Sequence, residues 1–361
     1  MKSNRKVHIV FVLPSLVPGG AERVMSFICQ SISKKKFEAE LLIIGSVKDT
    51  SYNTNGIKVT YLNKQRVLYS IPLLYMILAK KQPDIVFSSI SYLNTVLGFL
   101  AFFLKKPKFI GREANIPSVI EKYMNRKIIF DSVITKFCYK YLDVLICQSK
   151  DMLVDIKSTY KISDEKLRLI NNPVTDSFNL KQEKEKKGNP VFITVARMKK
   201  QKGHLRILNS LSSLDFDFTY YIVGDGPEKN KILSLAKKLG LNKKIVHIPY
   251  TEKVFKYLQL SDYFLQGAYV EGFPNCLLES CAVGTPIIAF DAPGGLNEII
   301  VEDMNGYIAK DHSEFVQCIQ KACKKDWDPK SIRKNILDKY GKEKILNQYE
   351  KLFFEVYNHS K

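Results

Sequence analysis

Two glutamates that stand eight residues apart make residues 269–284 (YVEGFPNCLLESCAVG) the stretch of this chain best suited to chemistry. Glu271 lies on a predicted loop, and Glu279 lies on a helix predicted for Cys276–Val283. Glu279 is placed to accept hydrogen bonds from a diol such as a ribose, and Glu271 to meet hydroxyls or developing positive charge. Either glutamate alone could be an ordinary solvent-exposed residue of a loop or a helix. That alternative does not explain why both flank one Gly-Phe-Pro turn.

The start of that helix is a second candidate for ligand binding. We expect Asn275, which follows Phe273 and a proline in the turn, to cap the helix. The backbone amides of Cys276, Leu277 and Leu278 then lack partners within the helix. Amides in that position attract an anion.

A basic loop supplies side chains for the same anion. In residues 191–203 (VFITVARMKKQKG), Arg197 follows a predicted strand, and Lys202 comes five residues later, before a glycine and a new helix. A guanidinium and an ammonium on one loop suit a diphosphate. The alternative is a solvent-exposed run of charge, which the neighbouring Lys199 and Lys200 favour.

Two glycine turns also follow predicted strands. Gly19 and Gly20 precede a helix and let the backbone approach a phosphate, although a simple tight turn explains them as well. Gly224 begins a G-x-G that permits a close approach, but Lys229 stands where a G-x-G-x-x-G has its third glycine. No acidic residue ends a strand about twenty residues further on, so NAD binding is poorly supported.

The elements that must position these residues form a repeating pattern. Short apolar strands alternate with helical stretches on both sides of KQEKEKKGNP (Lys181–Pro190), a charged segment typical of a linker. The alternation predicts an α/β fold with two Rossmann-like parallel-sheet domains, at residues 1–175 and 191–340, and a linker at 176–190. Because parallel sheets bind ligands at the carboxyl ends of their strands, we expect two facing domains with the ligand in the cleft between them.

Composition excludes several classes of protein. With 45% hydrophobic and 25% charged residues, the chain is an ordinary folded protein rather than a disordered one. Its formal net charge is +20, and residues 1–180 hold 27 Lys and Arg against 14 Asp and Glu, so we expect an anionic partner to meet that half. Seven cysteines without a C-x2-C pair indicate reduced thiols in a cytosol.

Two apolar runs resemble membrane or export signals. Val7–Val17 follows basic residues, but His8 interrupts it and no cleavage pattern follows, so we expect a buried first strand. Ile85–Leu104 has twenty residues without a charge, which is long enough for a bilayer. The polar residues in its first half favour a buried strand followed by an apolar helix.

Four motifs together resemble glycosyltransferase family 4. They are GGAERV (Gly19–Val24), the R-x4-K of Arg197 and Lys202, VGDGPE (Val223–Glu228) and EGFPNCLLES (Glu271–Ser280), and Gly294, Gly295 and Glu298 match a further helix start. The resemblance covers nearly the whole chain. It implies the GT-B fold, with the last helix, in residues 341–361, crossing back to the N-terminal domain.

The resemblance also implies an activity and roles for the residues. The enzyme would transfer a hexosyl or N-acetylhexosaminyl group, with retention, from a nucleoside-diphosphate sugar such as a UDP-sugar. Arg197 and Lys202 would neutralise the diphosphate, Glu279 would hold the ribose, and Glu271 would contact the sugar. Gly19 and Gly20 would close on the phosphates from the other domain.

One position departs from the family pattern. Many relatives have a histidine after the fourth or fifth N-terminal strand, where this chain reads FIGREANIPS (Phe109–Ser118) with Ala114 in that place. Arg112 and Glu113 therefore become the candidates for acceptor binding.

We expect no metal and no other cofactor. Asp215 and Asp217 match a D-x-D, but they lie on a connection away from the predicted carboxyl ends, and the five histidines show no ligand spacing. Arg197, Lys202 and helix amides are sufficient to stabilise a departing diphosphate.

The basic N-terminal half predicts a membrane partner. Lys105, Lys106 and the stretch Glu121–Leu142, where basic and aromatic residues alternate, suit an anionic membrane surface. The alternative is that this stretch is a solvent-exposed helix face without a membrane partner. We therefore expect a cytoplasmic enzyme on the inner face of the membrane. The resemblance, which extends to bacterial surface-polysaccharide enzymes, implies that it adds a sugar to a polyprenyl-diphosphate-linked glycan of O-antigen or capsule synthesis.

Two other functions stay open. A GT-B-fold epimerase would convert a nucleotide sugar without an acceptor. A basic nucleic-acid-binding protein would explain the charge, but the sequence has no recognition motif of that class, and we expect no nucleic-acid partner.

Overall fold

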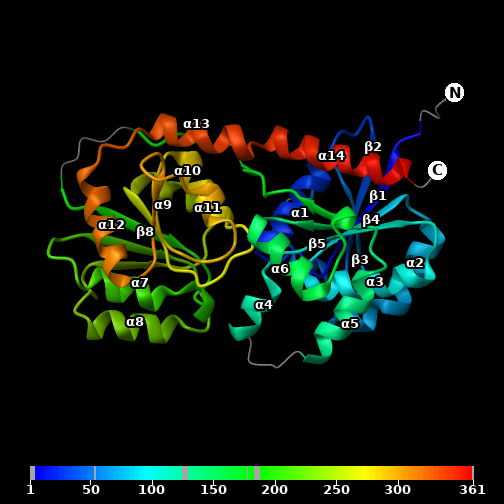
Figure 1. Cartoon of the computed structure of the whole chain (residues 1–361), viewed down its shortest axis with the longest axis horizontal. Helices are drawn as coiled ribbons and strands as arrows, with labels where there is room; N and C mark the ends of the chain where they lie inside the picture. The colour runs from blue at the N-terminus through cyan, green and yellow to red at the C-terminus, as the bar shows by residue number, and fades with distance from the viewer. Residues whose placement is uncertain (1–4, 53, 124–128, 177, 183–187, 360–361) are drawn as a thin grey trace. The chain divides into compact units, whose positions relative to one another are not determined.

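The computed structural model describes residues 5–52, 54–123, 129–176, 178–182 and 188–359 (Figure 1). The chain divides into two compact units, one of residues 1–175 with 342–361 and one of residues 176–341. Each unit contains one parallel sheet covered by helices, which confirms the predicted fold class of two parallel-sheet α/β domains.

The first unit has a seven-stranded sheet in the order β3-β2-β1-β4-β5-β6-β7. The strands are β1 (Val7–Leu13), β2 (Phe37–Ile43), β3 (Lys58–Tyr61), β4 (Ile85–Ser89), β5 (Lys108–Arg112), β6 (Val144–Cys147) and β7 (Leu167–Leu169). The helices are α1 (Gly20–Ser31), α2 (Ile71–Lys81), α3 (Ser91–Phe103), α4 (Pro117–Ile120), α5 (Ile129–Tyr139), α6 (Lys150–Tyr160) and α14 (Lys342–Asn358).

The first core forms around β1, the strand with the most continuous apolar sequence. Its alternate residues Ile9, Phe11 and Leu13 are fully buried in one cluster with α1 and α14. Phe353 of α14 makes edge-to-face ring contacts with Phe11, at 6.2 Å between centroids, and with Phe87, at 5.5 Å. The C-terminal helix is therefore an integral part of the first unit's core, and the run predicted as a buried strand is one.

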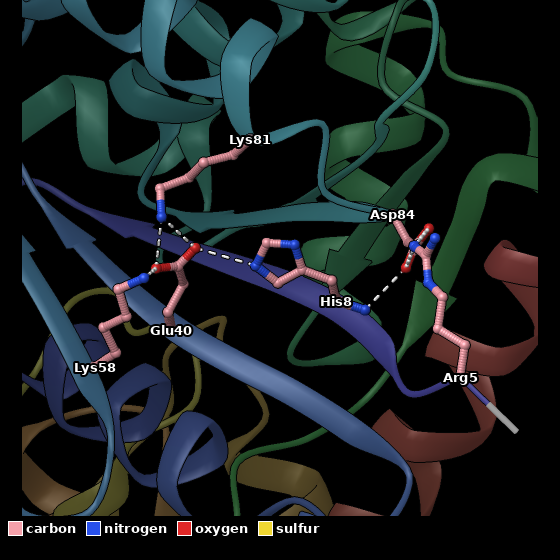
Figure 2. Close-up of polar contacts among 6 residues, drawn as sticks. All are labelled: Arg5, His8, Glu40, Lys58, Lys81 and Asp84. Atoms are coloured by element: carbon pink, nitrogen blue, oxygen red, sulfur yellow. Dashed lines mark hydrogen bonds and ion pairs between the residues drawn. The ribbon is translucent and has the colours of Figure 1, made fainter.

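A charged cluster ties β1, β2, β3 and α2 together, as Figure 2 shows. Glu40 of β2 is 5% exposed and accepts from Lys81 through both oxygens at 2.8 Å. His8 Nε2 lies 3.0 Å from Glu40 Oε1, and Lys58 Nζ lies 3.5 Å from Oε2. Burial alone would raise the pKa of Glu40, but the hydrogen bonds from His8 and Lys81 and the lysine charges lower it to about 2.

The second unit has a six-stranded sheet in the order β10-β9-β8-β11-β12-β13. The strands are β8 (Val191–Val195), β9 (Thr219–Val223), β10 (Ile245–Ile248), β11 (Tyr263–Gln266), β12 (Ile287–Phe290) and β13 (Gly306–Ala309). The helices are α7 (His204–Leu211), α8 (Lys229–Lys238), α9 (Val254–Leu260), α10 (Asn275–Val283), α11 (Leu296–Ile299), α12 (His312–Lys324) and α13 (Pro329–Tyr340).

The uncharged run at residues 85–104 forms β4 and then α3, as predicted from its polar first half. Across the described ranges, no helix has both the length and the apolar character needed to cross a bilayer. The predicted linker lies partly outside the described residues, because residue 177 and residues 183–187 fall in gaps.

Candidate active site

Four loops meet at the carboxyl edge of the second sheet, where β9, β8, β11 and β12 are neighbours. The loop after β8 bonds to the loop after β9 through Met198 N to Asp225 O, at 2.9 Å, and Glu228 N to Met198 O, at 2.9 Å. The loop after β11 bonds to the loop after β8 through Tyr269 N to Gln201 O, at 2.8 Å. These backbone bonds fix the predicted site residues of the second unit on one scaffold.

Lys202 and Glu271 form the central ion pair of this edge. The ammonium donates to both carboxylate oxygens, at 2.7 and 2.8 Å, and Gln266 Nε2 donates to Glu271 Oε1 at 3.0 Å. Glu271 is 7% exposed. Burial would lower the pKa of Lys202, but the Glu271 charge, Cys276 and the hydrogen bond to Glu271 outweigh it and raise the pKa, so Lys202 is cationic at neutral pH.

Arg206, which no sequence motif singles out, clamps the loop that carries Glu271. Its Nε donates to Gly267 O at 2.7 Å, and its NH2 group donates to Ala268 O. The guanidinium carbon lies 4.1 Å from the ring centroid of Tyr269 and 4.2 Å from that of Phe290. Two carbonyls and two aromatic faces thus hold one guanidinium between α7 and the loop.

Close backbone contacts require glycine at two positions of this edge. A Cβ on Gly224, which has φ +129°, would lie 2.4 Å from Ala196 O. A Cβ on Gly294, which has φ +126°, would lie 2.4 Å from Glu271 O. Glu271 N also donates to Pro293 O at 3.0 Å, so the loop after β12 supports the glutamate from behind. Gly295 is the N-cap of α11, which agrees with the predicted helix start.

The helix that carries Glu279 begins one residue earlier than predicted. Pro274 is the N-cap, with extended backbone, and Asn275 is the first helical residue, so the predicted cap at Asn275 is wrong. Proline's fixed φ lets the chain leave the turn in an extended conformation and enter the helix at once. Leu277 N donates to Pro274 O at 3.1 Å, so this amide, predicted to bind an anion, already has an internal partner.

Other predicted residues near this helix have defined places. Glu279 is 6% exposed on α10, and Leu278 is buried with its side chain in the core. Cys276 is partly exposed in the first turn. Phe273 is buried, and its ring contacts that of Tyr340 at 5.3 Å, so it anchors the Gly-Phe-Pro turn to α13.

The remaining charges of the second unit separate into two groups. Arg197 is exposed two residues after β8, and its charge opposes the rise in the pKa of Lys202. Asp215 and Asp217 are exposed on the connection from α7 to β9, where Asp217 pairs with Lys244 at 2.9 Å. The D-x-D therefore occupies a solvent-facing turn, as predicted, at the edge opposite to the candidate site.

In the first unit, Gly19 and Gly20 begin α1 at the carboxyl end of β1. Gly19 is the N-cap, and its amide donates to the hydroxyl of Tyr52 at 2.7 Å, while this hydroxyl donates to Gly19 O at 2.8 Å. No sequence motif indicated this tyrosine. Binding of a phosphate by the two glycines stays a prediction, in which the Gly19 amide has to be shared with Tyr52.

Arg112 and Glu113 are both 0% exposed. Arg112 donates to Tyr349 at 3.2 Å, to Ser89 at 3.2 Å and to Asn172. Glu113 accepts from Ser91 at 2.6 Å, from Asn94 at 2.9 Å and from Tyr139. These hydrogen bonds lower the pKa of Glu113, but burial raises it by more, so the pKa lies above its ordinary value. Their partners are internal, so a role in acceptor binding stays a prediction and has to be an indirect one.

Comparisons with known proteins identify the family. The model described as "Glycosyl transferases group 1" matches residues 176–344, and that described as "Glycosyltransferase Family 4" matches residues 18–178. The chain is 26% identical over 318 residues to an N-acetylgalactosaminyltransferase of Campylobacter jejuni that acts on N-acetylgalactosamine-N,N'-diacetylbacillosaminyl-diphospho-undecaprenol, covering 83% of this chain and 85% of that protein. It is 24% identical over 387 residues to the UDP-Gal:alpha-D-GlcNAc-diphosphoundecaprenol alpha-1,3-galactosyltransferase of Escherichia coli, covering 97% and 95%.

Solved structures agree at the level of the fold. Anabaena Alr3699/HepE, crystallised in complex with UDP, superposes with a TM-score of 0.80 at 16% identity, covering 97% of this chain and 100% of that one. With two family matches that run from residue 18 to residue 344 and two parallel sheets of this type, the chain belongs to glycosyltransferase family 4 and is a glycosyltransferase of the GT-B fold.

Proposed function

We propose that this glycosyltransferase moves a hexosyl or N-acetylhexosaminyl group from a UDP-sugar to a polyprenyl-diphosphate-linked glycan, with retention of configuration. The product would serve surface polysaccharide assembly, such as O-antigen or capsule synthesis. The observation that carries the donor half is the Lys202–Glu271 pair, which sits at the carboxyl edge of the second sheet on the same loops as Arg197 and α10.

The chemistry follows from the charges at this edge. In the transfer, the bond from the anomeric carbon to the diphosphate breaks, a bond from that carbon to an acceptor hydroxyl oxygen forms, and the hydroxyl proton passes to the departing diphosphate. The diphosphate departs with the electron pair, so negative charge grows there. Lys202, held cationic, and Arg197 stabilise that charge electrostatically, and in many enzymes such stabilisation lowers the barrier more than any other effect. Glu271 faces the positive charge that develops on the sugar.

The donor and acceptor classes rest on the activities for which the relatives are named. Both relatives act on diphospho-undecaprenol-linked sugars, and one uses UDP-Gal. We extend the lipid-linked acceptor class and the UDP donor to this chain, and with them a place at the inner face of the cytoplasmic membrane. We also propose that neither a metal nor another cofactor is required, since Arg197 and Lys202 supply the cationic charge.

A donor screen tests the proposal directly. We expect UDP and one UDP-sugar to raise the melting temperature of the purified protein, because a ligand at about 100 times its Kd stabilises by about 2.7 kcal/mol. Transfer to an undecaprenyl-diphosphate-linked sugar should then follow with that donor in the presence of EDTA. Stabilisation by other nucleotides but not by UDP would refute the donor, and conversion of the donor without any acceptor would identify an epimerase.

A further inference from the structure

Four exposed aromatic side chains and the half-buried Tyr141 form a continuous patch at the ends of α3 and α5, here called the aromatic patch: Phe99, Phe102, Phe103, Phe137 and Tyr141. Neighbouring rings meet edge to face, with centroids 5.2 Å apart for Phe99 and Phe103, 5.0 Å for Phe103 and Phe102, 5.1 Å for Phe102 and Tyr141, and 5.2 Å for Tyr141 and Phe137. Phe102, Phe103 and Phe137 are each 52% exposed. Contiguous exposed apolar surface of this kind marks an interaction site.

The two helices hold the patch in place. Gly98 of α3 packs against α5 so closely that a Cβ there would lie 2.4 Å from Cys138 O. Thr95 and Thr135 face each other across the same contact at 3.0 Å between hydroxyl oxygens. Figure 1 shows α3 and α5 lying beside each other in the first unit. The rings are therefore presented by a preformed surface, which reduces the entropy lost on binding.

The patch belongs to an apolar and basic region. Of the nineteen large apolar side chains that are exposed among the described residues, eleven lie between residues 68 and 137. Lys105 and Lys106 are exposed directly after α3, and Lys140 is exposed beside Tyr141. From Val67 to Tyr141 the sequence holds eleven Lys and Arg against four Asp and Glu; of these four, Asp84 is bound through both oxygens by Arg5 at 2.7 Å, and Glu113 is buried.

This combination selects one kind of partner. Protein interfaces are depleted of lysine, whereas aromatic rings flanked by lysines suit the boundary between anionic headgroups and acyl chains. We propose that the aromatic patch inserts into the interfacial layer of an anionic lipid bilayer, and that Lys105, Lys106 and Lys140 bind its headgroups. The proposal rests on the proposed function in one respect, because a lipid-linked acceptor lies in the membrane and the enzyme has to bind there to reach it.

The structure changes the surface that the sequence predicted. Tyr139, which alternates with the basic residues in sequence, is 1% exposed and donates to Glu113, so it belongs to the core. Arg126 and Lys127 lie outside the described residues. Lys136 is half-buried on α5. The exposed rings therefore predict insertion into the bilayer in addition to attraction by charge.

A tryptophan reporter tests insertion. The sequence has one tryptophan, Trp327 in the second unit, so Trp327→Phe gives a dark background. In that background vesicles of phosphatidylglycerol and phosphatidylcholine are added to Phe103→Trp. The tryptophan fluorescence should then shift to the blue, and brominated acyl chains should quench it. Tyr250→Trp, at a position 58% exposed in the second unit, is the matched control and should show neither effect.

Partition into the same vesicles gives a second measure. Phe102→Ser combined with Phe103→Ser should weaken vesicle binding of the full chain by about tenfold or more, since two large apolar side chains are lost. The exposed apolar positions Val47 and Val154, changed to serine, should leave binding unchanged. In about 1 M salt, where the Debye length is about 3 Å, residual binding should persist in the wild type and vanish in the double variant.

Three outcomes overturn the proposal. Vesicle binding without a blue shift or quenching at Phe103→Trp shows adsorption by charge alone. A wild-type chain that ignores anionic vesicles at low salt has no lipid surface at all. A wild-type dimer that the two serine changes convert to a monomer shows that a second copy covers the patch. Stabilisation by UDP, measured in the same variants, reports separately on the proposed donor, so either result can fail without the other.

Discussion

Lys202 of the loop after β8 and Glu271 of the loop after β11 face each other through two hydrogen bonds, at 2.7 and 2.8 Å. They are 69 residues apart, and they meet because β8 and β11 are neighbours in the sheet. The pair joins the residue proposed to bind the diphosphate to the residue proposed to face the sugar. A change at either residue therefore alters the charge that the other one presents.

We expect Lys202→Met and Glu271→Gln to be coupled. Each single change leaves a largely buried charge without its partner and should lower the free energy of unfolding by on the order of 2 kcal/mol. The double variant should lose less than the sum, by about 1 kcal/mol or more, in urea unfolding followed by circular dichroism. Losses that simply add would show that the pair contributes nothing as a pair.

The sequence predicted the strands well, because strands buried on both faces are continuous apolar runs between turn residues. β1, β4 and β8 begin at Val7, Ile85 and Val191, the first residues of the runs in which the sequence predicted them. Elements without that signal were missed, among them β7, which has three residues, and α13, whose sequence is mostly polar. The sequence singled out Lys202 and Glu271 as site candidates, each from the pattern of its own loop. It did not predict that the two side chains form an ion pair.

The misses at the site have physical reasons. Arg206 lies on a helix surface in the sequence pattern, and its partners are backbone carbonyls and rings that only the packing of two loops brings near. Tyr139 lies in a stretch where basic and aromatic residues alternate, a pattern that predicts a surface position. Its side chain is nevertheless buried, where the hydroxyl donates a hydrogen bond to Glu113. The cap of α10 moved to Pro274 because an extended proline ends the turn without help from a side chain.

Glu279 should decide donor binding. Glu279→Ala is expected to abolish the melting-temperature shift produced by UDP or a UDP-sugar, because the proposed ribose acceptor is gone. Because Glu279 is 6% exposed, the shift of each variant is measured from the melting temperature of its own free protein. Glu302→Ala, at an exposed carboxylate of the same unit that pairs with Lys321, is the matched control and should keep the shift. A full UDP shift in Glu279→Ala would remove this residue from the donor site.

Glu40 should make the first unit sensitive to acid. Its pKa in the folded protein, about 2, lies below the ordinary value, so the folded state binds the proton less readily. The resulting stability, on the order of 3 kcal/mol, is present above about pH 4.5 and is lost as the pH falls toward 2. Glu40→Gln should therefore be less stable at pH 7 and equal to the wild type near pH 2 in urea unfolding. Asp217→Asn, at an exposed carboxylate paired with Lys244, should show little of this pH dependence.

The opposite result would be a Glu40→Gln variant whose loss of stability is the same at pH 7 and near pH 2. It would mean that the substitution removes packing contacts rather than a charge interaction.

Arg206 should act as a positioning residue for Glu271 rather than as a group that touches substrate. Arg206→Lys keeps the charge but loses the forked donors to Gly267 O and Ala268 O and the stacking on Tyr269 and Phe290. We expect kcat to fall by about tenfold or more, since a small displacement of a catalytic carboxylate is enough for that loss. The Kd for UDP should change less, because Arg206 donates to the loop of Glu271, which is proposed to face the sugar, and not to the side chains proposed to bind the diphosphate. Lys200→Arg, at an exposed position three residues after Arg197, should leave both constants unchanged. Equal losses in kcat and in UDP affinity would show instead that Arg206 supports the whole carboxyl edge of the sheet.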